Sequence, residues 1–386
     1  MVKAAGLTGA TVLVEPDPDG HRFQAVANVA AVAGQSGEVI LLTSRGATAT
    51  DWFQLFLAGA PIEVIERFDE VHPPTAEMAR AIAELCRRRA IGTVVVMDAD
   101  ASLKRWWYVA AREFRGLPRR PRVVFMLTRY IARVELFDRQ AFFQRFSKAL
   151  LVIAAMATRT LDRAGGFAGR DDLSTGWVVK RLRDPAVCSA HSRDRDQLRR
   201  ELGLPSDRRL VGIVGAIDAR KSVPLVYEAT LASGADADLV VAGTLKDDVR
   251  AWLDAQPAGA LDRMILLARY LDNDELDKLV AACDVVSVVQ LNKGPSGIMG
   301  KALTAGVPVV TAGSRVRARE VAVTHGGLAA DMTVPSIADA LRRLYAEGGA
   351  LIRADVLPAA TGETFARALL GVDADGRVTT RRASPG

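Results

Sequence analysis

The sequence predicts an α/β protein built from two similar halves, each a parallel sheet with helices on both faces. Three observations lead to this prediction. At 386 residues the chain is long for one hydrophobic core, so two domains are the better expectation. Short runs rich in Val, Ile and Leu alternate with helical segments along most of the chain. Several runs, such as residues 92–97 and 285–289, are apolar throughout, which is typical of parallel strands buried on both faces.

The first half, residues 1–183, is predicted to form one domain. Its strands are expected to be parallel, because helical segments separate most of them. In chain order, we predict strands at residues 11–15, 38–43, 62–65, 92–97, 122–127 and 150–155, and helices at residues 22–33, 75–89 and 133–149.

Polar residues follow two of these strands, where ligands bind in doubly wound sheets. Gly20 and His21 come after the first strand, and Asp98 and Asp100 come after the fourth. Two interpretations of each remain open. His21 is either a site residue or a surface loop residue, and the aspartates either bind a ligand or cap the next helix.

A strongly basic segment lies between residues 104 and 148. It holds 12 Lys or Arg residues and 3 Asp or Glu residues, whereas the whole chain has a net charge of +6. Trp106, Trp107 and Tyr108 belong to it. Aromatic residues beside arginines suit a membrane surface or an acceptor-binding patch, but we favour core aromatics beside a solvated helix face. The segment holds no nucleic-acid-binding motif, so no nucleic-acid partner is expected.

A polar, charge-dense stretch at residues 184–207 is predicted to link the two halves. Apolar strands resume after it and define a second domain at residues 208–372. We expect the last helix to pack back toward the first domain, and residues 373–386 to be a disordered tail. The predicted elements are strands at residues 210–215, 238–243, 263–267, 285–289 and 307–311, and helices at residues 224–231, 247–255, 272–282, 336–346 and 362–370.

A glycine-rich stretch at residues 293–310 is the clearest local signal of the second half. It follows a strand and becomes helical after Ser296, Gly297 and Ile298. Unpaired backbone N–H groups at such a helix start face the positive end of the helix dipole and suit a phosphate. From this stretch alone, an ordinary connection with glycines for tight turns is an equal alternative.

Composition restricts the setting and the chemistry. No apolar run reaches the roughly 18–20 residues needed to cross a bilayer. Three widely spaced cysteines, at positions 86, 188 and 283, and only four histidines match no metal-binding pattern. We therefore expect a cytoplasmic protein without a metal site.

Several motifs of the second half occur in a specific order. They are LRRELGLPSDRRL at 198–210, VGIVGAIDARK at 211–221, LDNDELDKLVAACDVV at 271–286, the glycine-rich stretch at 293–310, and Arg-Glu-Val at 319–321. In this order and spacing, residues 198–339 resemble the donor domain of retaining GT-B glycosyltransferases. The first half resembles the acceptor domain of that family more loosely, through Gly20, His21 and Arg22 after the first strand.

The resemblance implies two Rossmann-like domains that face a cleft. It implies that a sugar passes from a nucleotide-diphosphate sugar, the donor, to an acceptor hydroxyl with retention of configuration, and that no metal ion or cofactor takes part. At the matching positions, Arg220 and Lys221 would hold the diphosphate. The candidate acceptor-side catalytic residues are His21, Asp98, Asp100 and Arg129, and the candidate donor-binding residues are Gly20, Gly215, Arg220, Lys221, Lys293, Ser296, Gly297, Ile298 and Lys301.

Two lysines depart from the family pattern. The family has two glutamates with seven residues between them, and Lys293 and Lys301 occupy both positions with the spacing kept. Ala216 stands where the family has an arginine. A lysine donates hydrogen bonds and cannot accept them from ribose hydroxyls, as a glutamate does. We expect Lys301 to point into the cleft; the alternative is a first-turn helix residue that faces solvent.

This reversal of charge keeps three functions in competition. The leading hypothesis is an active glycosyltransferase. The second is an enzyme of the same fold that uses an unusual anionic donor or a sugar phosphate, because an extra anion would meet the lysines. The third is a non-catalytic binding protein that kept the fold and lost the site. The acceptor is not identified, and the basic segment leaves peripheral membrane contact open.

Overall fold

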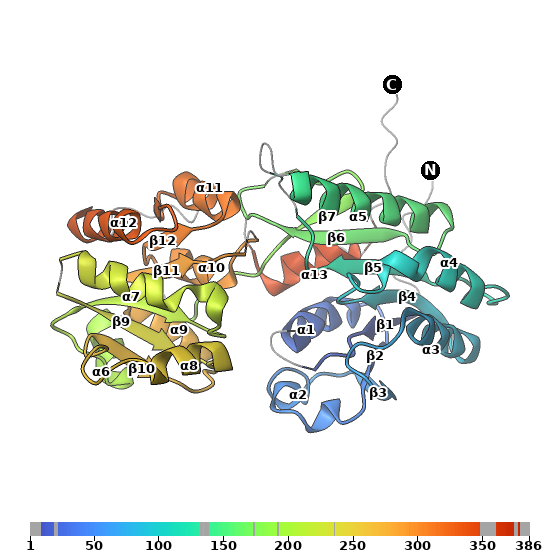
Figure 1. The fold of residues 1–386 in the computed structure, drawn as a ribbon. Coiled ribbons are helices and arrows are strands. Elements are labelled where there is room, and N and C mark those ends of the chain that lie inside the picture. Colours follow the sequence, from blue (N-terminus) through green and yellow to red (C-terminus); the bar gives the residue numbers. More distant parts are fainter. Residues whose placement is uncertain are drawn as a thin grey trace. The chain divides into compact units, whose positions relative to one another are not determined.

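The computed structural model describes residues 9–18, 22–131, 134, 139–172, 174–190, 193–234, 236–292, 294–347, 360–373, 377 and 378. The chain divides into two compact α/β units (Figure 1). Unit 1 contains residues 1–168, 173–183 and 361–386, and unit 2 contains residues 169–172 and 184–360. The predicted fold class, two Rossmann-like α/β units, is confirmed.

Unit 1 is built on a parallel sheet with the strand order β3-β2-β1-β4-β5-β6-β7. Its strands are β1 (Ala10–Val14), β2 (Val39–Ser44), β3 (Glu63–Phe68), β4 (Ile91–Val96), β5 (Arg122–Leu127), β6 (Arg163–Ala168) and β7 (Val179–Arg183). Its helices are α1 (Arg22–Ala33), α2 (Asp51–Phe56), α3 (Thr75–Arg88), α4 (Leu103–Glu113), α5 (Arg139–Ala157) and α13 (Gly362–Leu370), and Ala47–Ala49 form the short 3₁₀ helix η1.

Each face of this sheet carries its own hydrophobic core. Side chains of α3, α4 and α5 pack on one face, and those of α1, α2 and α13 pack on the other. Helix α13 therefore belongs to unit 1, although it is the last helix of the chain. Its carboxyl end receives two arginines of the sheet: Arg163 donates to the Ala368 carbonyl at 2.7 Å, and Arg122 donates to the Leu370 carbonyl at 2.6 Å. Cations at this end complement the helix dipole.

Unit 2 repeats the plan with the strand order β10-β9-β8-β11-β12-β13, again parallel. Its strands are β8 (Arg209–Val214), β9 (Ala237–Ala242), β10 (Met264–Leu267), β11 (Val285–Val289), β12 (Val309–Ala312) and β13 (Gly327–Ala329). Its helices are α6 (Arg195–Leu202), α7 (Val223–Ala232), α8 (Asp247–Asp254), α9 (Asn273–Ala282), α10 (Gly297–Thr304), α11 (Arg315–Thr324) and α12 (Val334–Glu347), with the 3₁₀ helix η2 (Ala219–Lys221).

The strand order reverses direction once in each unit. In unit 1 the chain moves outward from β1 to β3 and then returns to place β4 on the other side of β1. In unit 2 the same reversal puts β8 beside β11. In open α/β sheets, ligands bind at the carboxyl ends of the strands at such a switch point. The residues just after β1 and β4, and those just after β8 and β11, are therefore the places to search.

The predicted strand at residues 150–155 is wrong, because these residues continue helix α5. Val152 and Ala155 are buried while Leu150 and Ile153 are exposed, which is a helical repeat. A short apolar run does not distinguish a strand from a helix by itself. Strands β6 and β7, which take the place in the sheet expected for residues 150–155, were not predicted.

The segment expected to be a linker, residues 184–207, folds as part of unit 2 instead. Asp194 caps α6 by accepting a hydrogen bond from the Gln197 amide, and Leu198 is buried in the core. The high charge of the segment has a structural use. Arg199 is buried and donates to Asp284 at 2.7 Å, and Asp284 also accepts from the Leu210 amide.

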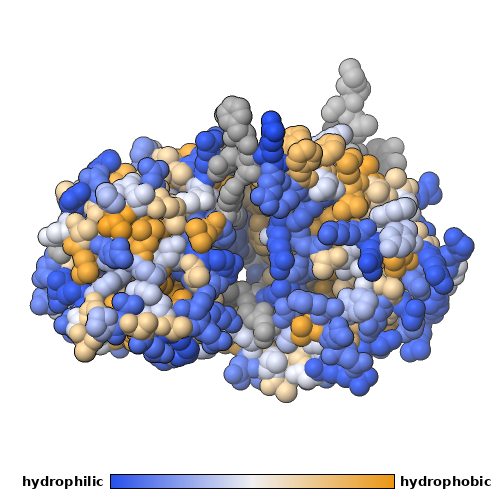
Figure 2. All heavy atoms as spheres, in the orientation of Figure 1, coloured by the Kyte–Doolittle hydropathy of each residue, from blue (hydrophilic) through white to orange (hydrophobic). Residues whose placement is uncertain are grey.

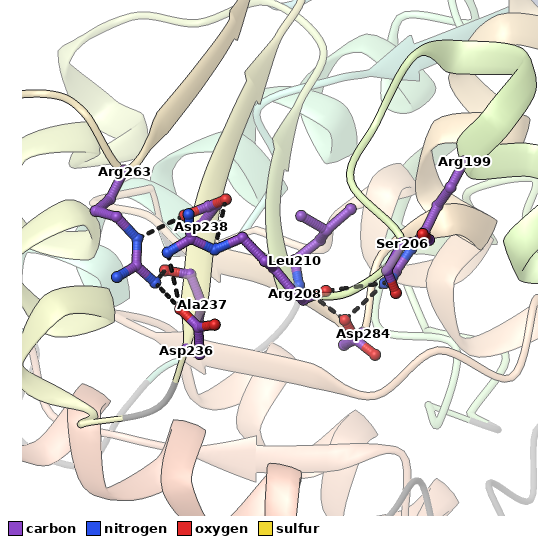
Figure 3. Close-up of polar contacts among 9 residues, drawn as sticks. All are labelled: Arg199, Ser206, Arg208, Leu210, Asp236, Ala237, Asp238, Arg263 and Asp284. Carbon is purple, nitrogen blue, oxygen red and sulfur yellow. Dashed lines mark hydrogen bonds and ion pairs between the residues drawn. The ribbon is translucent and has the colours of Figure 1, made fainter.

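Figure 3 shows this charge network at the amino-end edge of the unit 2 sheet. Beside Arg199 and Asp284, Arg208 and Arg263 both pair with Asp236 and with Asp238. The charges drawn there are paired with one another, and they lie at the strands' amino ends, whereas ligands of open α/β sheets bind at the carboxyl ends. They therefore stabilise unit 2 and are poor candidates for a ligand site.

Of the predicted tail, Asp373, Arg377 and Val378 are described, and Val372 forms an antiparallel bridge with Val378. The remaining residues of the predicted tail, 374–376 and 379–386, lie outside the described residues.

Candidate functional site

Two glycines shape the end of β8 at the switch point of unit 2. Gly215 has φ +103° and Gly243, at the end of β9, has φ +134°. A Cβ on Gly243 would lie 1.8 Å from the Gly215 carbonyl oxygen. Only glycine permits both this backbone conformation and this close approach. The ends of β8 and β9 thereby lie close together at the edge where a ligand would approach.

Lys221 follows this bend at the end of η2. Its ammonium turns back and donates a hydrogen bond to the Val214 carbonyl at 2.9 Å. Burial lowers the pKa of Lys221 to about 8, and the opposing effect of Asp218 does not cancel it. Arg220 and Arg317 lower this pKa further. With this pKa the ammonium is still mostly charged at neutral pH, and a cation held at a strand end is a candidate for binding an anion.

Arg317, on α11, is a second buried cation at this switch point, and its side chain is 0% exposed. Within the described ranges its guanidinium binds neutral oxygens and no carboxylate. It donates to the carbonyls of Gln290, Asn292, Gly294 and Ala312 and to the Thr311 hydroxyl. Burial lowers the pKa of Arg317 to about 10.

Arg317 therefore fastens the connection between β11 and α10 to the end of β12. Sequence reasoning missed this residue, because it stands among several arginines of a polar segment and fits no motif position. No local signal marks Arg317, since its role depends mainly on the carbonyls of Gln290, Asn292 and Gly294, which lie more than 20 residues earlier in the chain.

Arg220 is exposed and belongs to the rim of the site. Its guanidinium pairs with Asp218 at 2.6 Å, and its carbonyl accepts a hydrogen bond from the Leu291 amide. Asp218 also caps η2 through the Arg220 amide. The Arg220 charge is thus paired with a carboxylate, whereas Lys221 is the more deeply placed cation.

The amino end of α10 is the glycine-rich start singled out in the sequence. Ser296 is its N-cap and accepts a hydrogen bond from the Met299 amide at 3.3 Å. A Cβ on Gly297 would lie 3.0 Å from Asp184 Oδ2, so a carboxyl group of the chain itself stands beside the first turn. Burial raises the pKa of Asp184. Ile298 is half-buried, and its side chain reaches toward Gly215 at the end of β8.

A buried ion pair holds this end of α10 in place. Arg170 donates to the Ser296 carbonyl at 2.5 Å, and its Nε lies 2.7 Å from Glu320 on α11. Both charged side chains are almost completely buried. Gly300 makes room for them, because a Cβ there would lie 1.4 Å from Arg170 Nη1. Glu320, part of the Arg-Glu-Val motif, is thus a positioning residue for the start of α10.

Lys301 has a partner that the sequence did not suggest. Its ammonium lies 2.6 Å from Asp277 on α9 and donates to the Val187 carbonyl at 2.9 Å. Asp277 is buried and also accepts from the Ser189 amide at 2.7 Å. The lysine therefore compensates a buried carboxylate within unit 2, and the expectation that it points into the cleft stays a prediction. Lys293 lies outside the described residues.

The switch point of unit 1 has the opposite charge. Glu15 directly follows β1, and its side chain is 1% exposed. Its Oε1 accepts from the Asp17 amide at 3.1 Å and lies 3.4 Å from Arg22, while Oε2 has no hydrogen-bond partner within the described residues. Burial raises the pKa of Glu15 to about 8, although Arg22 opposes this shift.

Arg22, at the start of α1, is shared among three carboxyl groups. It lies 2.9 Å from Asp98 and 3.3 Å from Asp17, in addition to its contact with Glu15. Glu15 and Asp98 come from the two strands that flank the switch point, so Arg22 joins them across it. Sequence reasoning listed Asp98 but missed Glu15, which looked like the last residue of a strand.

Asp98 and Asp100 are brought together by Thr128, which directly follows β5. The Thr128 hydroxyl donates to Asp98 Oδ1 at 3.1 Å and to Asp100 Oδ2 at 3.2 Å. Asp100 also accepts from the Arg129 amide at 2.9 Å and pairs with Lys148 of α5. The alternative that the pair caps the next helix is wrong, because Ser102 holds the N-cap position of α4. Arg129 contributes its backbone there and has an exposed side chain.

Gly20 and His21 lie outside the described residues, so their part in this cluster stays a prediction. Among the residues that are described, no group of His, Cys, Asp and Glu is arranged to hold a metal ion. Every helix within the described ranges is too short or too polar to span a lipid bilayer.

Comparison with known proteins identifies the second unit. The family model of glycosyl transferases group 1 matches residues 208–347. Residues 208–347 are a group 1 glycosyltransferase domain. No curated protein sequence matches the chain closely enough to count as a relative.

Solved structures agree on the fold of this glycosyltransferase. It superposes on HepE from Anabaena in complex with UDP with a TM-score of 0.62, at 15% identity, covering 93% of this chain and 95% of that one. It superposes on WaaG, a glycosyltransferase involved in lipopolysaccharide biosynthesis, with a TM-score of 0.61 at 17% identity, covering 94% and 99%. A putative UDP-N-acetylglucosamine 2-epimerase from Listeria monocytogenes gives 0.59 at 14% identity, covering 95% and 96%.

These identities are low, and the likeness therefore establishes the GT-B fold of the enzyme. The matched domain contains the bend at Gly215, Lys221, the start of α10 and Arg317. The cationic switch point of unit 2 thus lies within the glycosyltransferase domain.

Proposed function

We propose that this glycosyltransferase moves a sugar from a nucleotide-diphosphate sugar to an acceptor hydroxyl, with retention of configuration and without a metal ion. The observation that carries the proposal is the Lys221 ammonium at the switch point of the matched domain, with the buried Arg317 guanidinium near enough to lower its pKa. HepE, which shares the fold, was solved with UDP bound.

The diphosphate is the group that these cations suit. Sugar transfer makes the nucleotide diphosphate a leaving group, and negative charge grows on it as the bond to the sugar breaks. Lys221 lies close to the end of β8 in a buried position, where a charge interaction is stronger than in water. Arg220 adds charge from the rim. Binding of a dianion would raise the pKa of Lys221 and keep its ammonium charged.

The start of α10 is the proposed neighbour of the diphosphate. Its glycines let a phosphate approach the N–H groups of Gly297 and Ile298 closely. Asp184 already stands beside that turn, and burial raises the pKa of its carboxyl group. Lys293 stays a predicted contact of the same ligand.

The acidic cluster of unit 1 is the proposed acceptor side. Glu15, Asp98 and Asp100 offer carboxyl oxygens that accept hydrogen bonds from hydroxyl groups. Retention requires that the acceptor hydroxyl attacks on the face that the diphosphate leaves, so the leaving group itself is a suitable proton acceptor. The role proposed for the carboxyl groups is therefore to bind and orient the acceptor.

The alternative of an unusual anionic donor or a sugar phosphate relied on two lysines, and one of them, Lys301, has a partner within unit 2. Asp277 and the Val187 carbonyl take the Lys301 ammonium, so the extra anion would have to meet Lys293 alone. We therefore keep an ordinary nucleotide sugar as the proposed donor.

The test is release of nucleoside diphosphate from a panel of UDP-, GDP- and ADP-sugars by the full chain, with and without EDTA. We expect slow hydrolysis of one class of donor that EDTA leaves unchanged. Substituting Lys221→Met should reduce the rate by about 10- to 100-fold, because a charge-assisted contact to the leaving group is lost. Lys278→Met, which removes a partly exposed lysine of α9 that pairs with Asp274, serves as the charge-matched control.

No release from any donor, together with no binding of any nucleoside diphosphate, would favour the non-catalytic binding protein. Release that stops with EDTA and returns with a divalent cation would overturn the metal-independent mechanism.

A further inference from the structure

The outer face of α5 is unusually apolar for a solvent-facing helix. Three phenylalanines, Phe142, Phe143 and Phe146, are 54%, 65% and 51% exposed, and Leu150 and Ile153 continue the face. The opposite face of the same helix is buried in the unit 1 core through Ala141, Val152 and Ala155. In Figure 2 a hydrophobic area lies over the part of unit 1 where Figure 1 shows α5.

These exposed side chains form one continuous stripe. Positions 142, 146, 150 and 153 follow one another at intervals of four, four and three residues, which places them on one side of a helix. The rings of Phe142 and Phe146 are stacked 6.1 Å apart, and Phe142 also meets Phe143 edge-on. Single exposed hydrophobic residues are common, but five large ones side by side on one helix face mark an interaction surface.

Basic residues surround the stripe. Arg139 begins α5 and is exposed. At the other end of the helix, Arg120 donates to the Arg159 carbonyl at 2.8 Å, and both arginines are exposed. Helix α4 lies beside α5 and exposes Lys104 and Arg105. The apolar stripe therefore has a cationic rim.

We propose that the α4–α5 face of unit 1 docks on an anionic lipid surface. The phenylalanines would enter the boundary between headgroups and acyl chains, while the basic rim contacts lipid phosphates. Exposed Trp107 and Tyr108 on α4 have the amphipathic rings that favour this boundary.

Two other possible occupants of this face, a second copy of the chain and a nucleic acid, fit it less well. A symmetric dimer would place the face against a second copy of itself and bring two cationic rims together. A nucleic acid would match the charge and stack on the rings, but it would leave the aliphatic side chains of Leu150 and Ile153 in water. An anionic membrane offers an apolar interior to the stripe and negative charge to the basic rim. The proposal does not depend on the donor chemistry, and it places the acceptor-side unit at a lipid surface.

The experiment is sedimentation of the full chain with phosphatidylcholine vesicles, either alone or mixed with phosphatidylglycerol. We expect binding to the anionic vesicles that weakens with added salt, and little binding to the neutral ones. The double substitution Phe142→Ser and Phe146→Ser should lower the bound fraction by about 10-fold or more. Lys104→Gln with Arg105→Gln should remove part of the salt-sensitive component.

The matched control is Leu231→Ser with Val323→Ser, which removes two exposed apolar residues from unit 2 and should leave vesicle binding unchanged. Melting temperature checks that each variant folds. Absence of binding to anionic vesicles at low salt, or a phenylalanine variant that binds like the wild type, would overturn the proposal. A concentration-dependent dimer that the phenylalanine substitutions abolish would assign the face to a second copy instead. Nucleotide binding is measured without vesicles, so that a failure of membrane docking can be told apart from a failure of the proposed sugar transfer.

Discussion

The two units share one sheet plan and carry opposite charges at the same place in it. At the switch point of unit 1, Glu15, Asp17 and Asp98 gather around Arg22. At the switch point of unit 2, Lys221 is partly buried and donates to the Val214 carbonyl, and Arg317 is buried among backbone carbonyls. A common fold therefore supplies a common position for a site, and the residues after each strand decide which ligand it suits. Carboxyl groups suit the hydroxyls of an acceptor, and buried cations suit a diphosphate.

A second contrast lies within unit 2. Its amino-end edge holds arginines paired with aspartates, as Figure 3 shows, whereas the Arg317 guanidinium at the carboxyl-end edge binds neutral oxygens within the described residues. Paired charges stabilise the fold. Cations without a carboxylate are an unfavourable arrangement that an anionic ligand improves.

The largest expected effect concerns the buried ion pair of unit 2, Arg170 and Glu320, which holds the start of α10. Replacing Arg170→Met leaves the Glu320 carboxyl buried without its partner and frees the Ser296 carbonyl. We expect the free energy of unfolding to fall by about 4 kcal/mol, as for other broken buried pairs. Chemical denaturation measures it. The double variant Arg170→Met with Glu320→Gln should recover part of the loss, and an unchanged midpoint for the single variant would contradict the role given to the pair.

Lys301 provides the next test, because it separates a structural lysine from one that recognises the donor. Lys301→Glu places a carboxylate next to buried Asp277 and should cost about 3 kcal/mol of stability. Adding Asp277→Lys restores an ion pair with the charges exchanged. If the double variant recovers both stability and donor affinity, the lysine is structural. Recovered stability with lost affinity would show that Lys301 contacts the donor after all.

Glu15→Gln tests the acidic switch point of unit 1 through the pH dependence of the protein's stability. The folded-state pKa is raised to about 8, so between pH 4.5 and 8 the unfolded chain loses the proton that the folded chain keeps. Wild-type stability should therefore decline as pH rises through this window. We expect the variant to become more stable than the wild type by about 2 kcal/mol at pH 8, with a much smaller difference at pH 5.

Thermal unfolding at several pH values measures this difference, and Glu70→Gln, an exposed glutamate of unit 1, is the control that should show none. A Glu15 variant whose advantage is independent of pH would mean that the carboxyl is ionised in the folded protein.

Much of the fold was accessible from sequence, because it depends on local patterns. Strand β11 and helix α13 were predicted with their observed bounds, since apolar runs and caps define them. The motif order also located the glycosyltransferase domain. The run at 150–155 was assigned to a strand because its apolar composition does not reveal that only one side is buried.

The candidate site was predicted less completely, because its chemistry depends on distant partners. Lys221 could be recognised by its motif position alone. The role of Lys301 depends on Asp277 on the preceding helix, and that of Glu320 depends on Arg170, far away in the chain. Glu15 becomes buried only because β1 is a central strand of the sheet. No sequence window contains such information.

The most direct test of the account is calorimetric titration of the full chain with nucleoside diphosphates. The account predicts that one of them binds to the wild type and to Glu15→Gln with similar affinity, and that Lys221→Met weakens this binding by about 10- to 100-fold. Because the free-state pKa of Lys221 is about 8, binding should take up a proton near pH 8 and weaken as pH rises further. Equal affinity for the Lys221 variant, or loss of binding in the Glu15 variant alone, would contradict the assignment of the donor to unit 2.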